Sequence, residues 1–243
     1  MRGVLILHGF TGTPFEVSYL ADKLAGSGLV VQTPLLPGHG TSPLQLNRTT
    51  ADQWRGAVAD HLADLRSRTN APVAVVGQSM GGLLALDAAS QQAGIAAVVS
   101  LATPLRLAGV GRAMSALGLL PRRLTQNWPS IAKSGGGSDV RDLEIKAQNP
   151  SYPVLPLSGV VELTRLMRSV RRRLARIHCP LLAVHGRCDH TAPPDSASEI
   201  LASVASADRQ LLVVPNSYHL VAHDVERDRV AGAVGRFLAR VLV

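Results

Sequence analysis

Short apolar runs alternate along the chain with longer stretches in which apolar residues recur at helical spacing. The apolar runs are rich in valine, isoleucine and leucine, which is typical of strands buried on both faces. Strands are expected at residues 3–7, 29–36, 73–76, 95–101, 180–185 and 210–214, and helices at residues 15–25, 50–68, 82–89, 193–204 and 227–241. This repeated strand-then-helix order predicts an α/β fold with a mostly parallel, doubly wound sheet. Ligands are then expected at the carboxyl ends of the strands.

The alternation of strands and helices breaks between residues 105 and 175. This segment has no strand pattern, but it contains several prolines, short helical pieces and a glycine-rich linker at residues 134–138. We therefore expect two units. Residues 1–104 and 176–243 form an α/β core, and residues 105–175 form a helical cap inserted over the strand ends.

The last helix of this cap, expected at residues 160–177, is amphipathic. Its apolar face comprises Val160, Leu163, Met167, Val170, Leu174 and Ile177. Its arginines lie mostly away from that face and are Arg165, Arg168, Arg172 and Arg176. This basic face has two interpretations: a solvated surface, or a surface that attracts anionic lipid or a phosphorylated headgroup.

Composition limits the class of protein. With 243 residues, 46% of them hydrophobic, the chain is long enough to bury one large core. No apolar run approaches the length of a membrane span, and a strand follows Met1 almost at once, so no signal peptide is expected. Cys179 and Cys188 lie at the two ends of one predicted strand, about 30 Å apart, and cannot pair. These features predict a cytoplasmic protein in a reducing compartment.

The formal net charge of +8 comes mainly from arginine, since the only lysines are Lys23, Lys133 and Lys146. Such an excess of positive charge favours acidic partners. The chain has no nucleic-acid-binding signature, and aromatic residues make up only 3% of it, so nucleic-acid binding is not expected. The oligomeric state is left open.

A candidate nucleophile lies between the strand at residues 73–76 and the helix that follows it. The motif there is Gly77-Gln78-Ser79-Met80-Gly81. Gly-x-Ser-x-Gly at a strand-to-helix turn is the nucleophile elbow, in which glycines without a Cβ let the turn lift the serine hydroxyl clear of the sheet. The alternative is a strand-to-helix turn whose serine only caps the helix.

A serine nucleophile needs a base to accept its proton and an acid to orient that base. Asp189 and His219 each follow a later strand, and the chain order Ser79, Asp189, His219 is that of α/β-hydrolases. His223 is the nearest alternative base. Two further aspartates, Asp195 and Asp224, are expected to cap helices.

The oxyanion formed in such a reaction needs preorganised N–H donors. We expect them to be the backbone amides of Met80, which follows the nucleophile, and Phe10, which follows the first strand. Their side chains are expected to wall the acyl pocket. His8, two residues before Phe10, is expected to hydrogen-bond within this loop.

The motifs in this order resemble those of one known family. They are His8-Gly9-Phe10-Thr11-Gly12, Pro37-Gly38-His39-Gly40, Gly77-Gln78-Ser79-Met80-Gly81-Gly82, Asp189 before Pro193-Pro194, and Ser217-Tyr218-His219 with Asp224. Together they resemble the small bacterial carboxylesterases and monoacylglycerol lipases of the α/β-hydrolase superfamily. The resemblance implies a serine hydrolase with a helical cap, without metal or cofactor. It also implies Ser79 as nucleophile, Asp189 as acid, His219 as base, and Phe10 and Met80 as oxyanion donors.

The chain departs from the family in starting at the strand 3–7, where members usually have additional strands before it. The sequence assigns no role to Gln78, Arg187 or Cys188.

These observations predict a hydrolase of carboxylic esters that works through an acyl-enzyme intermediate. Short-chain to medium-chain acyl esters or monoacylglycerols are the expected substrates. An acyl thioesterase or a C–C bond hydrolase with the same triad is an alternative, and the basic cap helix would suit coenzyme A phosphates. A non-catalytic lipid-binding or ligand-binding module is a third hypothesis, which the presence of all three triad residues disfavours. Dehalogenases and epoxide hydrolases are disfavoured because they use aspartate at the position of Ser79.

Overall fold

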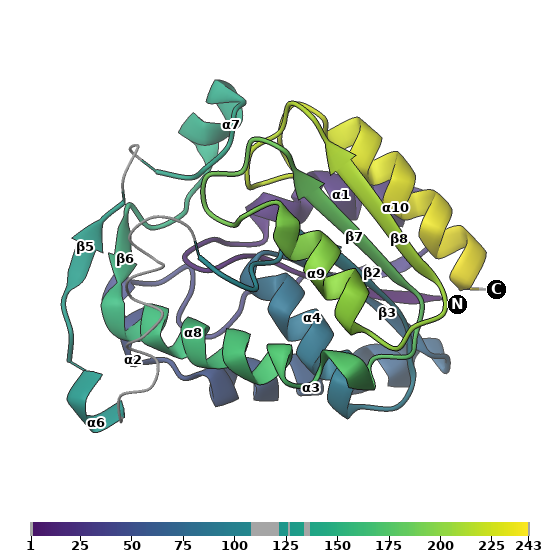
Figure 1. Ribbon diagram of the computed structural model, residues 1–243, viewed down its shortest axis with the longest axis horizontal. Coiled ribbons are helices and arrows are strands. Elements are labelled where there is room, and N and C mark those ends of the chain that lie inside the picture. Colours follow the sequence, from purple (N-terminus) through teal and green to yellow (C-terminus); the bar gives the residue numbers. More distant parts are fainter. Residues whose placement is uncertain (1, 108–121, 126, 134–136, 243) are drawn as a thin grey trace.

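The structure is a computed structural model that describes residues 2–107, 122–125, 127–133 and 137–242. Within these residues the central sheet has six strands, all parallel, in the order β2-β1-β3-β4-β7-β8 (Figure 1). The strands are β1 (Gly3–Leu7), β2 (Val30–Gln32), β3 (Val73–Gln78), β4 (Ile95–Leu101), β7 (Leu181–Gly186) and β8 (Arg209–Val214). The predicted parallel, doubly wound sheet is confirmed.

Helices cover both faces of this sheet (Figure 1). One face is covered by α1 (Phe15–Ala25) and α10 (Arg227–Val241), and the other by α3 (Ala51–Thr69), α4 (Met80–Gln91) and α9 (Asp195–Ser203). Successive strand residues point to opposite faces. In β1, Val4 and Ile6 therefore pack with α1 and α10, whereas Leu5 and Leu7 pack with α3 and α4.

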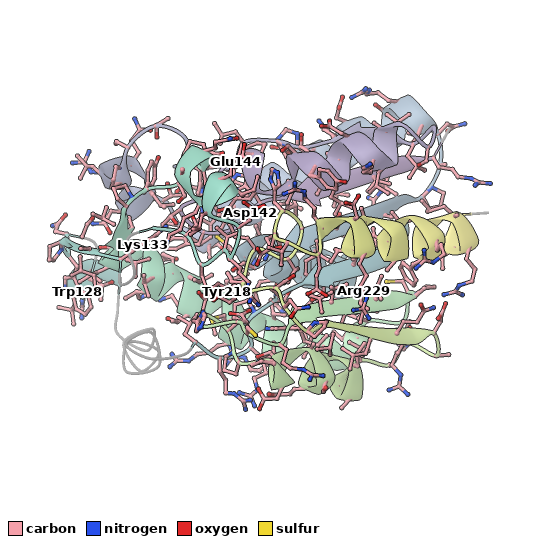
Figure 2. All side chains as sticks on the ribbon, turned by 90° about the horizontal axis from the view of Figure 1, so that it is seen from above. Trp128, Lys133, Asp142, Glu144, Tyr218 and Arg229 are labelled. Atoms are coloured by element: carbon pink, nitrogen blue, oxygen red, sulfur yellow. The ribbon has the colours of Figure 1, made fainter. Side chains whose placement is uncertain are left out.

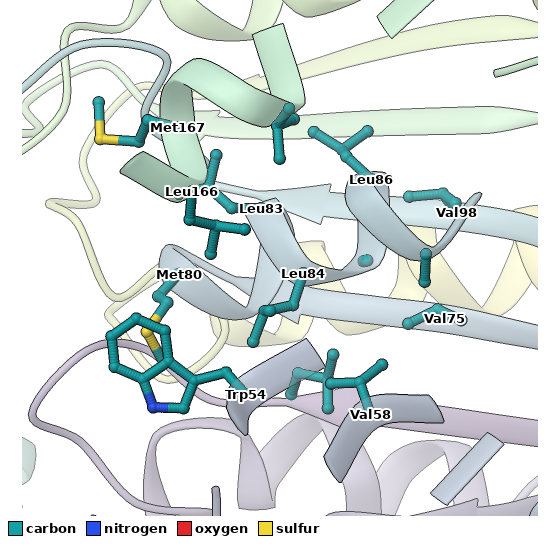
Figure 3. Packing of buried hydrophobic residues seen from close by; sticks show 14 of the residues in the cluster. Trp54, Val58, Val75, Met80, Leu83, Leu84, Leu86, Val98, Leu166 and Met167 are labelled. Carbon is teal, nitrogen blue, oxygen red and sulfur yellow. The ribbon is translucent and has the colours of Figure 1, made fainter. Parts of the chain in front are cut away.

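The last helix of the expected cap, α8 (Leu157–Arg171), shares the core of the α/β layers. Leu166 and Met167 of α8 lie in the same buried cluster as Leu83 of α4 and Trp54 of α3 (Figure 3). Burial of the expected apolar face is confirmed, from Val160 to the 3-10 turn Leu174–Arg176 that follows the helix. The division into core and cap itself stays a prediction.

The strand expected at residues 29–36 is shorter than predicted. Only β2 (Val30–Gln32) pairs with β1, at the edge of the sheet. Pro34 has no N–H to donate to a ladder, and the N–H of Leu36 donates instead to His8 Nε2 at 3.1 Å. The apolar run thus continues past the end of the strand, and its last residue, Leu36, is buried and hydrogen-bonded to His8 in the loop after β1.

The expectation of a cap without strands was wrong. Two antiparallel strands, β5 (Ser130–Ala132) and β6 (Val154–Pro156), lie in it beside the short helices α6 (Arg122–Thr125) and α7 (Leu143–Gln148). Strands of three residues are too short to produce an alternating pattern. Another short helix, α2 (Pro43–Arg48), precedes α3. Residues 108–121 and 134–136, including most of the glycine-rich linker, lie outside the described part.

Several arginines around α8 are paired with carboxylates. Arg165 pairs with Glu162, Arg171 with Glu199, and Arg173 with the buried Asp87. Arg172 and Arg176 are exposed. Attraction of this face to anionic lipid stays a prediction. Among the helices of the described residues, none combines the length and the hydropathy that a membrane span requires.

Candidate active site

The chain turns sharply at Ser79, where β3 passes directly into α4. Ser79 has φ +56° and ψ −114°, a conformation that residues with a side chain rarely adopt, and its N–H donates to Leu101 O at 2.8 Å. A Cβ on Gly77 would collide with the backbone of Gly81, and a Cβ on Gly81 would collide with Leu7 O. Both positions flanking the serine therefore require glycine, as the motif predicts.

The structure brings Ser79, His219 and Asp189 into one hydrogen-bonded line. His219 Nε2 lies 2.8 Å from Ser79 Oγ, and His219 Nδ1 lies 2.8 Å from Asp189 Oδ2. The serine follows β3, the aspartate follows β7 and the histidine follows β8, so all three lie at carboxyl ends of parallel strands. Ser79 is 8% exposed and His219 6% exposed, so the line is largely shielded from solvent.

Three other histidines, His8, His190 and His223, have partners outside this line. His223 Nδ1 donates to Phe15 O at 2.8 Å, away from this line. His8 is buried and hydrogen-bonds Gly9 O through Nδ1, so its expected role within the loop is confirmed. His190 Nδ1 lies 2.9 Å from a carboxylate oxygen of Asp139.

The carboxylate of Asp189 and the imidazolium of His219 stabilise each other. Burial alone would raise the pKa of Asp189, but the charge of His219 and hydrogen bonds from His185 and His219 hold it well below its usual value. Burial alone would lower the pKa of His219, but the Asp189 carboxylate, with Asp139 and Glu16, raises it. An ionised carboxylate therefore faces Nδ1 of a histidine that readily takes a proton.

The loop after β1 is fixed beside the serine. Gly9 N donates to the buried Glu16 carboxylate at 3.0 Å, and Gly12 N donates to Gly9 O at 3.2 Å. Within the described residues, no acceptor binds the N–H of Phe10 or of Met80, the two expected oxyanion donors. The Met80 side chain is fully buried next to Trp54 (Figure 3). Phe10, by contrast, is half-buried.

Two residues that the sequence analysis missed hold the loop of His219. The amide of the buried Gln78 donates to His219 O at 2.8 Å, and Ala222 N donates to Gln78 Oε1 at 3.4 Å. Asp139, from the expected cap, accepts through its carbonyl the N–H groups of His219 and Leu220, both at 3.1 Å. These partners are distant in sequence, so no local pattern could have indicated them.

Asp139 also contacts the loop that carries Asp189. Its carboxylate accepts from His190 N at 2.9 Å and from Thr191 Oγ1 at 3.0 Å. One residue of the expected cap therefore joins the loop of the candidate acid to the loop of the candidate base.

The expectation that Asp224 and Asp195 cap helices was wrong. α10 follows Glu226, α9 follows Pro194, and neither helix has a side-chain cap. Asp224 is instead fully buried and accepts the N–H groups of Arg141, Asp142, Tyr218 and Val225. It thereby joins the cap segment to the loop of His219, a junction at which Figure 2 labels Asp142 and Tyr218.

A parallel sheet covered on both faces, with a sharp serine turn at its carboxyl edge, is the α/β-hydrolase fold. A solved structure from a study of the metagenome-derived lipolytic enzymes LipS and LipT is 30% identical to this chain. It superimposes with a TM-score of 0.88 over 98% of this chain and 94% of its own. The sequence profile of the serine aminopeptidase S33 family matches residues 2–226, so the chain belongs to that family.

Two relatives indicate the kind of hydrolase. A thermostable monoacylglycerol lipase of Bacillus sp. (strain H-257) is 32% identical over 238 residues, which cover 98% of this chain and 90% of the lipase. A carboxylesterase of Bacillus subtilis (strain 168) is 28% identical over 241 residues, which cover 99% and 93% of the two chains. The protein is therefore an ester-hydrolysing enzyme of the esterase and monoacylglycerol lipase type.

Proposed function

We propose that the protein hydrolyses carboxylic esters through an acyl-enzyme intermediate formed on Ser79. The supporting observation is the continuous line from Ser79 through His219 to Asp189, with 2.8 Å at each step. This spacing suits transfer of the serine proton to His219 while Asp189 stabilises the imidazolium that results.

The reaction has two halves. Ser79 Oγ attacks the ester carbonyl carbon as its proton passes to His219 Nε2, and the N–H groups of Phe10 and Met80 bind the oxyanion. The bond from carbon to the alcohol oxygen then breaks, and His219 returns the proton to the departing alcohol. Water attacks the acyl group with His219 again as base, which releases the carboxylic acid and restores the serine.

We further propose short-chain to medium-chain acyl esters or monoacylglycerols as substrates. The support is the likeness to the monoacylglycerol lipase and the carboxylesterase, together with two apolar residues in the segments around the nucleophile. These are Met80, which follows Ser79, and Phe10, which follows Gly9 in the loop that passes Ser79. No cofactor enters the reaction, since each step uses only the residues named and water.

The intermediate is tested by rapid mixing with p-nitrophenyl butyrate. A burst of one p-nitrophenol per enzyme is expected where deacylation is slower than acylation, and quenched protein should carry a butyryl group on the peptide that contains Ser79. Acylation at another residue would contradict the proposal.

Substrate class is tested with one panel. It contains p-nitrophenyl esters from two to sixteen acyl carbons, matching monoacylglycerols, and an acyl-CoA beside its oxygen ester at low and high salt. A preference for the acyl-CoA that disappears at high salt would instead favour the thioesterase alternative.

The pH dependence of kcat/KM for an uncharged ester reports the ionisation of His219. Activity is expected to fall as the pH is lowered, because the imidazolium cannot accept the serine proton. The pKa of His219 is raised from 6.5, so the midpoint should lie above pH 6.5. The pKa of Asp189 is lowered, so this group stays ionised and adds no second step. A midpoint below 6.5, with circular dichroism showing folded protein, would contradict this assignment.

A further inference from the structure

Asp189 Oδ2 contacts a second imidazole besides that of His219. His185, in β7, is completely buried, and its Nε2 lies 3.0 Å from Asp189 Oδ2 and 3.3 Å from Ala192 O. Oδ2 therefore lies between two histidines, with His219 Nδ1 at 2.8 Å. The other oxygen, Oδ1, accepts the N–H groups of Thr191 at 2.8 Å and Ala192 at 2.7 Å.

The network assigns the proton of His185. Both groups near Nε2, the Asp189 carboxylate and the Ala192 carbonyl, are acceptors, so Nε2 carries a hydrogen and donates it. His185 Nδ1 is buried without a hydrogen-bond partner in the described residues. A neutral ring with its hydrogen on Nε2 fits this environment, because a protonated Nδ1 would leave a donor unpaired in the core.

We propose that His185 is a positioning residue of the triad, which acts by donating a hydrogen bond to Asp189 Oδ2. This proposal rests on the proposed function of Ser79, His219 and Asp189. The bond does two things that packing alone does not. It restrains the side-chain torsion of Asp189 through a contact separate from that of His219. It also neutralises part of the negative charge on Oδ2, the oxygen that His219 contacts.

The effect of His185 on the charge of Asp189 Oδ2 can be measured through the protonation of His219. A carboxylate oxygen that loses one of two donors attracts the remaining donor more strongly, so the imidazolium of His219 becomes more stable. The other charged groups that face His219 are Asp139 and Glu16, and the substitutions below leave both unchanged. The low-pH limb of kcat/KM should therefore move to higher pH when His185 stops donating.

Glutamine and asparagine provide a matched pair of substitutions. In His185→Gln the amide nitrogen falls close to the position of the histidine Nε2 and can donate to Asp189 Oδ2. In His185→Asn the amide nitrogen falls near the position of Nδ1, too short to reach that oxygen. Both variants place the same carboxamide in the same buried site, so they differ in reach rather than in polarity. His185→Leu removes the donor altogether.

kcat/KM for p-nitrophenyl butyrate is measured from about pH 5 to 9 for the three variants, with thermal unfolding as a check on folding. His185→Asn and His185→Leu are expected to lose about tenfold in kcat/KM on the plateau. Their low-pH midpoint should rise by about half a unit. His185→Gln should recover most of the activity and the wild-type midpoint.

Gln and Asn profiles that superimpose, whether at the wild-type level or uniformly lowered, would overturn the role of His185. The comparison needs only these two variants, so it holds even where the leucine variant does not fold. Failure of the proposed function is a distinct result. In that case ester hydrolysis would persist at the wild-type level when Ser79 is replaced with alanine.

Discussion

Replacing Ser79 with alanine is expected to lower kcat/KM for p-nitrophenyl butyrate by about 10⁴- to 10⁶-fold. Alanine removes the hydroxyl that lies 2.8 Å from His219 Nε2, and no acyl-enzyme can then form. The remaining rate over water would come from the oxyanion donors and from substrate binding. A fluorophosphonate probe, which phosphonylates activated serines, should label the wild-type enzyme and leave Ser79→Ala unlabelled.

A suitable control is Ser100→Ala. Ser100 is also a buried serine, on the neighbouring strand β4, but its hydroxyl donates to Thr103 Oγ1 and lies outside the triad line. This variant should keep fluorophosphonate labelling and remain within about threefold of the wild-type kcat/KM. Strong labelling of Ser79→Ala, or an equal loss in the two variants, would show that Ser79 is not the nucleophile.

Elements with a strong hydrophobic pattern could be predicted to the residue. β1, β4, α1 and α10 begin and end where their apolar patterns do. Helices cover both faces of these strands, and α10 has a clear apolar stripe. In these elements the apolar positions of the sequence are therefore the buried positions of the structure. β5 and β6 could not be predicted, because each has three residues and they pair across more than twenty residues of the cap.

The approach of Ser79, Asp189 and His219 could be predicted because parallel topology places the carboxyl ends of strands along one edge. The residues that support them could not. Gln78 contacts a loop 141 residues away, and a histidine inside a strand, such as His185, carries no sign that it faces a carboxylate. Pairwise contacts of this kind depend on register and loop path, which hydrophobic periodicity does not specify.

Replacing Asp189 with asparagine is expected to lower kcat by about 10³- to 10⁴-fold while the fold persists. Oδ1 accepts two backbone N–H groups, so the amide oxygen should take that position and turn the amide NH₂ toward His219 and His185. His219 Nδ1 must then accept a hydrogen bond instead of donating one. Its proton moves to Nε2, which faces Ser79 Oγ and can no longer receive the serine proton.

Asp195→Asn makes the same chemical change six residues away, at a mostly exposed side chain that pairs with Arg106. It should leave kcat within about threefold of wild type, because a surface ion pair contributes little. The decisive comparison is with Asp139→Asn, since Asp139 contacts the loops of both Asp189 and His219 and also raises the pKa of His219. If Asp139→Asn lost more activity than Asp189→Asn, the acid of the triad would be Asp139. The 2.8 Å contact between Asp189 Oδ2 and His219 Nδ1 predicts the opposite order, because only Asp189 contacts the imidazole directly.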